Sequence, residues 1–241
     1  MKAFEIKTFF SFTIFGVTVP ITETVIISWV VMLILIVGSI ILVRKLEIVP
    51  KGFQTVLEAG VELLNSYTVK SFGPFAVFLT PYLGSLFLFL LVGNIIGVIS
   101  PIEIKAFGHE FVPPFMIRPP TRDINVTAAF GCISIFLVLV CGFAARGLFG
   151  WIKHLFYPIA FMLPFNIMDY GTRLLSLSLR LFGNILGGYV LMSMIEGMLP
   201  IALPMVFALY FDLFDGVVQA AIFVFLTSLY IHEAVKNDDE E

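Results

Sequence analysis

The sequence is poor in charge. Asp, Glu, Lys and Arg make up only 13% of its 241 residues, against about 25% in ordinary soluble domains. Hydrophobic residues account for 59%, which is typical of a polytopic membrane protein and requires no soluble domain to explain the length. The formal net charge of −3 gives no basic surface for nucleic acid, so we expect none among the partners.

Cysteine and histidine are scarce. The two cysteines lie in one hydrophobic run, which argues against a disulfide framework, and the three histidines are too far apart in sequence for a metal-ligand pattern. We therefore expect no metal and no cofactor. The N-terminus lacks a short apolar core with a small-residue cleavage site, so we expect no cleaved signal peptide. The lack of a transit peptide favours a bacterial inner (plasma) membrane or an organelle-encoded, multi-pass protein.

Long uncharged runs predict an all-α fold, a single membrane domain over residues 1–241 with about five membrane-embedded helices. Three runs have the length of a spanning helix, and they cover 24–43, 77–99 and 124–145. Asp123 precedes the third run and is a candidate N-cap. Within the second run, Gly93 and Gly97 have a spacing that permits close helix approach, and Asn94 predicts an interhelical hydrogen bond more readily than a site.

Residues 51–70 show a different pattern, because their apolar and polar side chains fall on opposite faces of a helix. This predicts an amphipathic helix that lies on the membrane surface or on a partner. A solvated connector that packs on its own protein is an equal alternative.

The C-terminal third carries ionisable residues inside apolar sequence, over segments 155–196 and 205–231 with a proline-containing turn between them. These residues are Asp169, Arg173, Arg180, Glu196, Asp212 and Asp215. Charges in membrane segments are costly unless they face a protein interior or a water-filled cavity. We therefore expect a long, tilted helical hairpin that carries a polar path.

Arg180 lies in the middle of the first arm of this hairpin. Small and polar residues recur around it with helical spacing and form one stripe, which comprises Arg173, Ser176, Arg180, Gly183, Asn184 and Gly187. A guanidinium at the bilayer centre costs at least ~2.5–3.5 kcal/mol on insertion scales. Something must offset that cost.

The second arm has a matching stripe of Asp212, Asp215, Gly216 and Gln219, which share one face of an α-helix. One interpretation is a buried ion pair between Arg180 and an aspartate that only holds the arms together. The other is a path for ions. An arginine stays protonated, and at ~4 Å with effective ε ≈ 20 it interacts with a carboxylate by about 4 kcal/mol. That is enough to lower the pKa of a passing carboxylate by ~3 units.

The segment SLSLRLFGNILGG, residues 176–188, resembles the signature of subunit a of the F-type ATP synthase. Four further segments in the same order are similar to that family: PKGFQTVLE, LVGNIIGVISP, PTRDINVT and VVQAAIFVFLTSLYI. The resemblance covers nearly the whole chain.

This resemblance implies a non-catalytic stator subunit whose hairpin lies against a rotor ring of small hairpin subunits (subunit c), with the peripheral stalk subunit b, other ATP synthase subunits and membrane lipid as further partners. Two offset half-channels would lead H⁺ or Na⁺ to and from the ring carboxylate. Arg180 matches the family's essential arginine, and the polar positions implied along the path are Asn184, Gln219, Asp212 and, near the cytoplasmic half-channel, Asp169. Ser176 belongs to the same stripe as Arg180.

The sequence departs from the family at Tyr189, where some members carry an acid. A tyrosine, with a pKa near ~10, relays protons poorly at neutral pH, so we expect Asp212, and with it Asp215 or Glu196, to take that role. A secondary transporter that binds an anionic substrate at Arg180 is the main alternative function, although no internal repeat supports it. A membrane-embedded enzyme is a third, although zinc, nucleophile and phosphate-loop motifs are lacking.

Overall fold

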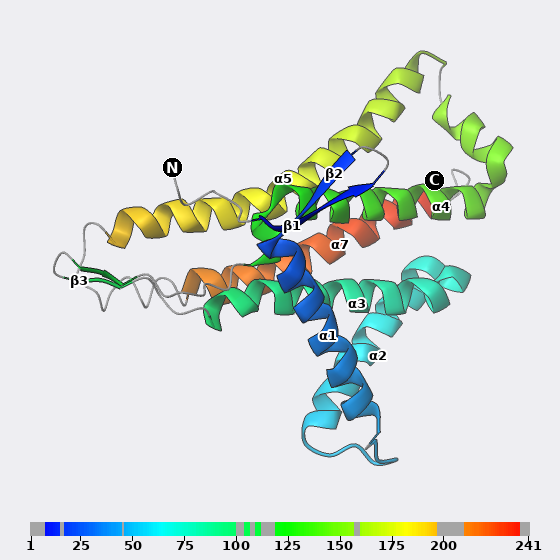
Figure 1. Cartoon of the computed structure of the whole chain (residues 1–241). Helices are drawn as coiled ribbons and strands as arrows, with labels where there is room; N and C mark the ends of the chain where they lie inside the picture. Colours follow the sequence, from blue (N-terminus) through cyan, green and yellow to red (C-terminus); the bar gives the residue numbers. More distant parts are fainter. Residues whose placement is uncertain are drawn as a thin grey trace. The chain divides into compact units, whose positions relative to one another are not determined.

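The computed structural model describes residues 8–14, 17–44, 46–99, 104–106, 109–111, 119–156, 160–196 and 210–236. Helices dominate this part of the chain: α1 Glu23–Val43, α2 Phe53–Phe72, α3 Ala76–Ile95, α4 Ile124–Leu155, α5 Leu163–Glu196 and α7 Gly216–Val235 (Figure 1). Shorter helical turns are 3₁₀ segments at Gly73–Phe75, Ile96–Ile99, Pro120–Arg122 and Ala160–Met162, and a π-helix at Tyr210–Asp215. The predicted fold class, an all-α polytopic membrane protein, is confirmed.

Two short antiparallel hairpins add to the helices. Strands β1 (Thr8–Ile14) and β2 (Val17–Thr22) pair with each other, as do β3 (Ile104–Ala106) and β4 (His109–Phe111). Neither hairpin was predicted. The first is rich in phenylalanine, valine, isoleucine and threonine, whose aromatic and β-branched side chains favour extended backbone.

Helix α4 is longer than the run of residues 124–145 that predicted it. It continues to Leu155 through a break at Gly147, whose φ of 71° is a left-handed conformation that glycine adopts without steric cost. Helix α5 begins only at Leu163, with Pro164 in its first turn, where a missing N–H costs no hydrogen bond. The first arm of the hairpin was predicted to begin at residue 155, but Leu155 ends α4, and the 3₁₀ turn Ala160–Met162 directly precedes α5.

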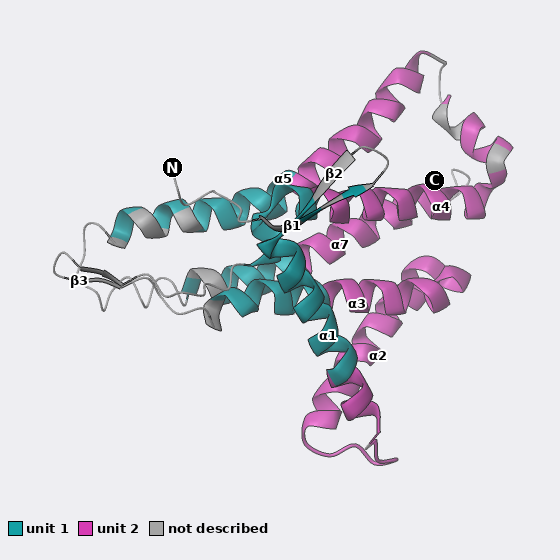
Figure 2. Cartoon of the chain, in the orientation of Figure 1, with its two compact units in different colours: residues 1–37, 89–127, 179–220 teal, residues 38–88, 128–178, 221–241 magenta. Residues whose placement is uncertain are grey.

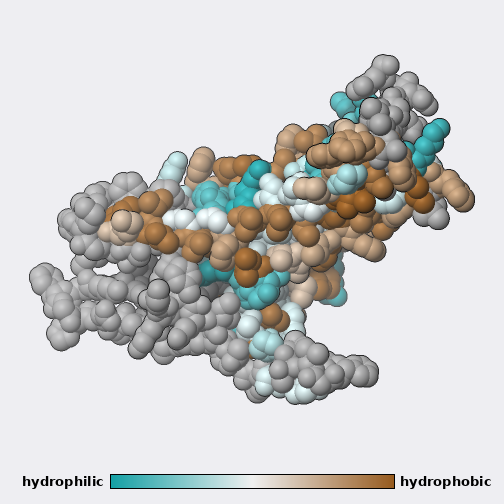
Figure 3. All heavy atoms as spheres, turned by 90° about the horizontal axis from the view of Figure 1, so that it is seen from above, coloured by the Kyte–Doolittle hydropathy of each residue, from teal (hydrophilic) through white to brown (hydrophobic). Residues whose placement is uncertain are grey.

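Four described helical stretches are long and apolar enough to cross a membrane: Glu23–Val43, Phe53–Ile95, Ile124–Gly147 and Leu213–Val235. Helix α5 is not among them, although it is the longest of the described helices, and it carries most of the ionisable residues of the predicted hairpin. Many large apolar side chains are exposed, such as Leu33 at 63% and Phe136 at 67%. Hydrophobic atoms also cover much of the coloured face in Figure 3, as expected for a surface that meets lipid.

The chain divides into two compact units (Figure 2). Unit 1 comprises residues 1–37, 89–127 and 179–220, and unit 2 comprises residues 38–88, 128–178 and 221–241. Helices α1, α3, α4, α5 and α7 each contribute one part to each unit.

In unit 1 the core forms between α1 and the end of α3. Ile27, Val31 and Ile96 are buried at its centre. The N-cap of α4 joins this core: Asp123 Oδ1 accepts the backbone N–H of Asn125 at 2.9 Å, which confirms the predicted cap. Its Oδ2 accepts the hydroxyl of Thr24, on α1, at 2.8 Å, so the buried carboxylate is satisfied on both oxygens.

In unit 2 the end of α2 packs against α7. The Tyr67 hydroxyl lies 2.9 Å from the Ser228 hydroxyl, and a ring nitrogen of His232 lies 2.9 Å from the Ser71 carbonyl oxygen. The rest of α2 is open, since Val56 is 67% exposed and Leu63 71% exposed. The apolar face of this helix is thus largely uncovered by the described residues.

Candidate functional site

Arg180 lies on α5 with its side chain exposed. Leu177 and Leu181, on the neighbouring strip of the helix, are buried at 1% and 0% exposure. Within the predicted stripe, Arg173 and Asn184 are partly buried and contact α7, whereas Arg180 is exposed. Gly183 and Gly187, farther along the stripe, are exposed, and no described atom lies within 4 Å of a side chain built there. In the part of the chain that the structure describes, Arg180 makes no ion pair; the side chain of Asp212, one of the two aspartates of the alternative salt bridge, lies outside the described side chains.

Beyond Arg180 along α5, a small hollow lies within unit 1. Residues from α3, α5, α7, the π-helix and the segment before α4 line it, and most of them are polar or small: Asn94, Pro119, Asn184, Ile185, Gly188, Asp215, Gly216 and Gln219. Its volume for water-sized molecules is about 40 Å³, more than the ~10–15 Å³ that a single water requires. The structure thus brings Asn184, Gln219 and Asp215 together at one site, as the facing stripes predicted.

Amide side chains build the wall of the hollow. Asn184 Nδ2 donates to Gln219 Oε1 at 3.4 Å, which connects α5 to α7. Gln219 is 4% exposed, and its Nε2 is buried without a hydrogen-bond partner among the described residues. A buried donor in this position requires an acceptor, because an unsatisfied polar group costs ~1–3 kcal/mol.

Asn94 was predicted as an interhelical hydrogen bond, and the structure confirms this. Its Nδ2 donates to the Gly216 carbonyl at 3.2 Å, and its Oδ1 accepts the Thr121 hydroxyl at 2.7 Å. Its place in the lining of the hollow was not predicted. The Gly93–Gly97 spacing was expected to let another helix approach closely. The neighbour at Gly97 is instead Pro119, which would lie 2.6 Å from a side chain placed on that glycine.

The stripe on the second arm is not regular α-helix, which corrects the prediction. Residues Tyr210–Asp215 form a π-helix, and α7 begins only at Gly216. A π-helix closes its hydrogen bonds over one more residue than an α-helix, so the α-helical spacing does not place Asp212 on the face of Gln219. At the end of this wide turn the Asn94 side-chain amide donates a hydrogen bond to the Gly216 backbone carbonyl. Such an insertion of a side chain into the backbone hydrogen bonding is a known cause of helix irregularity.

Other predicted site residues lie apart or outside the described side chains. Of Tyr189, Glu196 and Asp212 the structure describes only the backbone. Ser176 is exposed on α5 and belongs to unit 2, so it is not part of the hollow.

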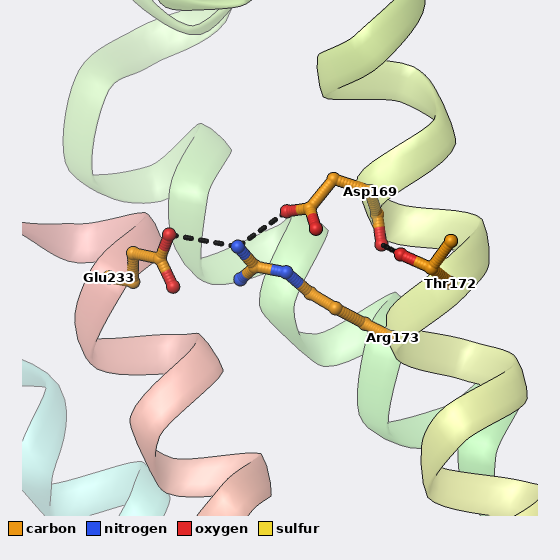
Figure 4. Close-up of polar contacts among 4 residues, drawn as sticks. All are labelled: Asp169, Thr172, Arg173 and Glu233. Atoms are coloured by element: carbon orange, nitrogen blue, oxygen red, sulfur yellow. Dashed lines mark hydrogen bonds and ion pairs between the residues drawn. The ribbon is translucent and has the colours of Figure 1, made fainter.

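Asp169 has a different environment, in unit 2, where it forms an ion pair with Arg173 (Figure 4). Arg173 Nη2 lies 2.8 Å from Glu233 Oε1, on α7, and its guanidinium lies 4.8 Å from the centre of the Tyr230 ring. Glu233 was not among the predicted site residues. Glu233 lies two heptads after Gln219 and therefore on the same face of α7. This spacing could have marked it as a site residue from the sequence.

A second hollow, of about 80 Å³ for water-sized molecules, lies beside this ion pair. Its lining consists of Val138, Asn166, Asp169, Tyr170, Arg173, Glu233 and Ala234. The Arg173 side chain is only 16% exposed, whereas its two acids are 49% and 60% exposed. Among the described residues, no group of three or more His, Cys, Asp and Glu side chains could hold a metal ion.

Comparison with known proteins decides the family. The family model described as ATP synthase A chain matches residues 25–232. The chain belongs to the ATP synthase subunit a family. It is 35% identical to "ATP synthase subunit a, sodium ion specific" of Propionigenium modestum, over 90% of this chain and 75% of that protein. It is also similar to subunit a of Moorella thermoacetica, at 34% identity over 88% and 90% of the two chains, and of Gloeobacter violaceus, at 35% over 90% and 85%.

As a subunit a, the chain is an ion-translocating stator subunit that works with other ATP synthase subunits. It is a membrane subunit without catalysis of its own, so the membrane-enzyme alternative is wrong. The family assignment also decides against the secondary transporter.

Proposed function

We propose that Arg180 is the fixed charge that separates two ion half-channels of this subunit. The observation that carries the proposal is an exposed arginine on the packed helix α5, with no ion pair among the described residues. A buried structural arginine would have its counter-charge within the chain. Arg180 instead faces outward beside two exposed glycines, as expected if its counter-charge belongs to another subunit.

The partner is a rotor ring of small hairpin subunits (subunit c), each with a carboxylate at the depth of Arg180. Gly183 and Gly187 have no side chains that would hold a ring helix away from α5. As each ring carboxylate passes, the guanidinium favours its charged form and so drives release of the bound proton or cation. Because the arginine stays protonated, it also opposes direct passage of a cation between the half-channels.

The two hollows belong to the two half-channels in this proposal. The first, with Asn184, Gln219 and Asp215, conducts ions from the side on which they enter during synthesis. The sequence assigns Asp212, Glu196 and Tyr189 to the same route. The second, beside Asp169, serves the cytoplasmic side, and Ser176 lies between Asp169 and Arg180 in the sequence of α5. Both hollows exceed the size of one water, and both have ionisable lining residues.

The remaining partners and the location follow the relatives. The peripheral stalk subunit b holds the stator against rotation. The open apolar face of α2 meets lipid or this stalk at the membrane surface. Since the similar proteins come from bacteria, we place the subunit in a bacterial inner (plasma) membrane. The coupling ion is H⁺ or, as in the name of the Propionigenium protein, Na⁺.

Substitution of Arg180 tests the proposal. The Arg180→Ala complex, purified with its ring and reconstituted in vesicles, should hydrolyse ATP but show no ATP-driven ion uptake. Arg44→Ala, which removes an exposed arginine just after the end of α1, is the matched control and should pump normally. Normal coupled pumping by Arg180→Ala would refute the function.

Substitution of Asp212 tests the ion path. Asp212→Asn should slow ion transport far more than Glu58→Gln, which alters an exposed acid of α2. Equal rates for the two variants would remove Asp212 from the route.

A further inference from the structure

The first hollow has one acid in its lining among the described residues, Asp215. Asp215 is half-buried at the last residue of the π-helix, and among the described residues it is the only titratable one that lines the hollow. Resting on the proposed function, we infer that Asp215 is the carboxylate that receives the coupling ion in this half-channel. It would replace the acid that some relatives carry at the position of Tyr189.

The π-helix is the first argument. A single wide turn is rare, and such turns occur frequently at functional sites. Here the turn ends next to Gly216, where the backbone of α7 comes so near to α3 that an added side chain would lie 3.0 Å from Asn94 Cβ. This contact anchors the end of the turn and sets Asp215 at the wall of the hollow. In a regular α-helix, by contrast, Asp212 would share the face of Gln219.

The hydrogen-bond inventory of the hollow is the second argument. Asn94 uses its donor on the Gly216 carbonyl and its acceptor on Thr121. Gln219 Oε1 accepts from Asn184, which leaves the buried Gln219 Nε2 as a donor without a partner among the described residues. A water in the hollow can accept from this amide and donate to the Asp215 carboxylate, and the volume is sufficient for it.

The chemistry follows from this arrangement. If the ion is a proton, a hydronium in the hollow gives H⁺ to a carboxylate oxygen of Asp215 and becomes water, and the carboxyl group later returns H⁺ to water on the ring side. If it is Na⁺, the carboxylate and the bridging water are hard oxygen ligands suited to a small cation. Both cations need the same negative group beside the same water.

Charged residues lie on several of the elements that line the hollow, including Arg122 and Asp123, which follow Pro119 in the turn before α4. Asp212 precedes it within the π-helix, and Tyr210 stacks on Phe214 in the same turn. From α5, the nearest charge along the helix is Arg180, one turn before Asn184. Asn94 and Pro119, which face the hollow from the other elements, are uncharged. Asp215 is therefore the group whose replacement should change the ion dependence of transport through this hollow.

The experiment uses the whole complex, reconstituted in vesicles, with four variants: Asp215→Asn, Asp215→His, Gln219→Leu and the control Glu62→Gln on exposed α2. Asp215→Asn should slow ATP-driven transport at least about tenfold, consistent with the loss of a positioned acid–base group. Asp215→His should restore part of the rate. Because the ordinary pKa of a histidine side chain is higher than that of a carboxylate, the pH profile of this variant should also move upward if the ion is H⁺.

If the ion is Na⁺, the half-saturating Na⁺ concentration should rise in Asp215→Asn instead. The double variant Asp215→Asn/Gln219→Leu should lose less than the product of the two single losses, because one water connects both groups. A wild-type rate for Asp215→Asn, with unchanged pH and Na⁺ dependence, would overturn the inference and leave the role of Arg180 intact. Normal pumping by Arg180→Ala would instead refute the proposed function itself.

Discussion

Helix α5 carries two arginines, Arg173 and Arg180, two turns apart on one stripe, and their surroundings differ. Arg173 forms ion pairs with Asp169 and Glu233 and lies over the Tyr230 ring, with its side chain 16% exposed. Arg180 is exposed, and no described residue pairs with it. Both belong to a helix of a membrane protein, where an unpaired charge is costly.

The difference separates a structural arginine from one that needs an external partner. Arg173 has its compensation within the chain, so its loss should affect stability first. In the proposed function the charge of Arg180 is compensated by another subunit, so its loss should affect transport first. Four substitutions test this contrast, from the largest expected effect to the smallest.

Arg180→Ala should abolish ATP-driven transport and leave the stability of the subunit almost unchanged. Away from special contacts, surface substitutions change the free energy of unfolding by no more than ~0.5 kcal/mol. Thermal unfolding of the detergent-solubilised complex, followed beside ion uptake, checks both parts. A large fall in melting temperature would show that Arg180 has a structural partner.

Arg173→Ala should show the reverse pattern. The change leaves two carboxylates of α5 and α7 without their shared cation, and we expect a loss of about 1–2 kcal/mol, because both acids are half-exposed and screened by solvent. Transport should fall much less than in Arg180→Ala. Complete loss of transport with unchanged stability would erase the distinction between the two arginines.

Glu233→Gln should have a smaller effect, since Arg173 keeps Asp169 as its partner. We expect a loss below about 1 kcal/mol. The double variant with Arg173→Ala should be no less stable than Arg173→Ala alone, which a double-mutant cycle on unfolding midpoints can measure. Additive losses would mean that the Arg173–Glu233 ion pair contributes nothing.

Tyr230→Leu should have the smallest effect. It removes the aromatic face 4.8 Å from the Arg173 guanidinium while keeping most of the apolar volume, and a cation–π contact contributes about 0.5–1 kcal/mol. The same substitution in the Arg173→Ala background should be nearly neutral. An equal loss in both backgrounds would assign the effect to packing of the ring instead.

Much of this architecture follows from the sequence, because hydrophobic runs, caps and stripes depend on local spacing. The apolar run predicts α1 to within a residue, and the N-cap Asp123 precedes α4 as expected. The sequence also predicts that the polar stripes containing Asn184 and Gln219 face each other, although it does not show that these two side chains form the hydrogen bond.

Features that depend on tertiary contact could not be predicted. The π-helix before Gly216 arises where α7 meets Asn94 of α3, a contact between residues far apart in the chain. Glu233 pairs with Arg173 only because α5 and α7 meet in unit 2. The spacing of residues within one helix does not tell how far that helix lies from another. The left-handed Gly147 is equally hidden, because a single glycine in an apolar run does not reveal its φ.

The most direct test of the role of Arg180 is passive ion leakage through the intact complex, with its catalytic sites inhibited so that the ring cannot turn. Vesicles loaded with a cation gradient should stay tight with the wild-type subunit and with Arg173→Ala. They should leak with Arg180→Ala, because the fixed positive charge between the half-channels is gone. If Arg180→Ala vesicles hold the gradient as well as wild type, Arg180 does not separate the two half-channels.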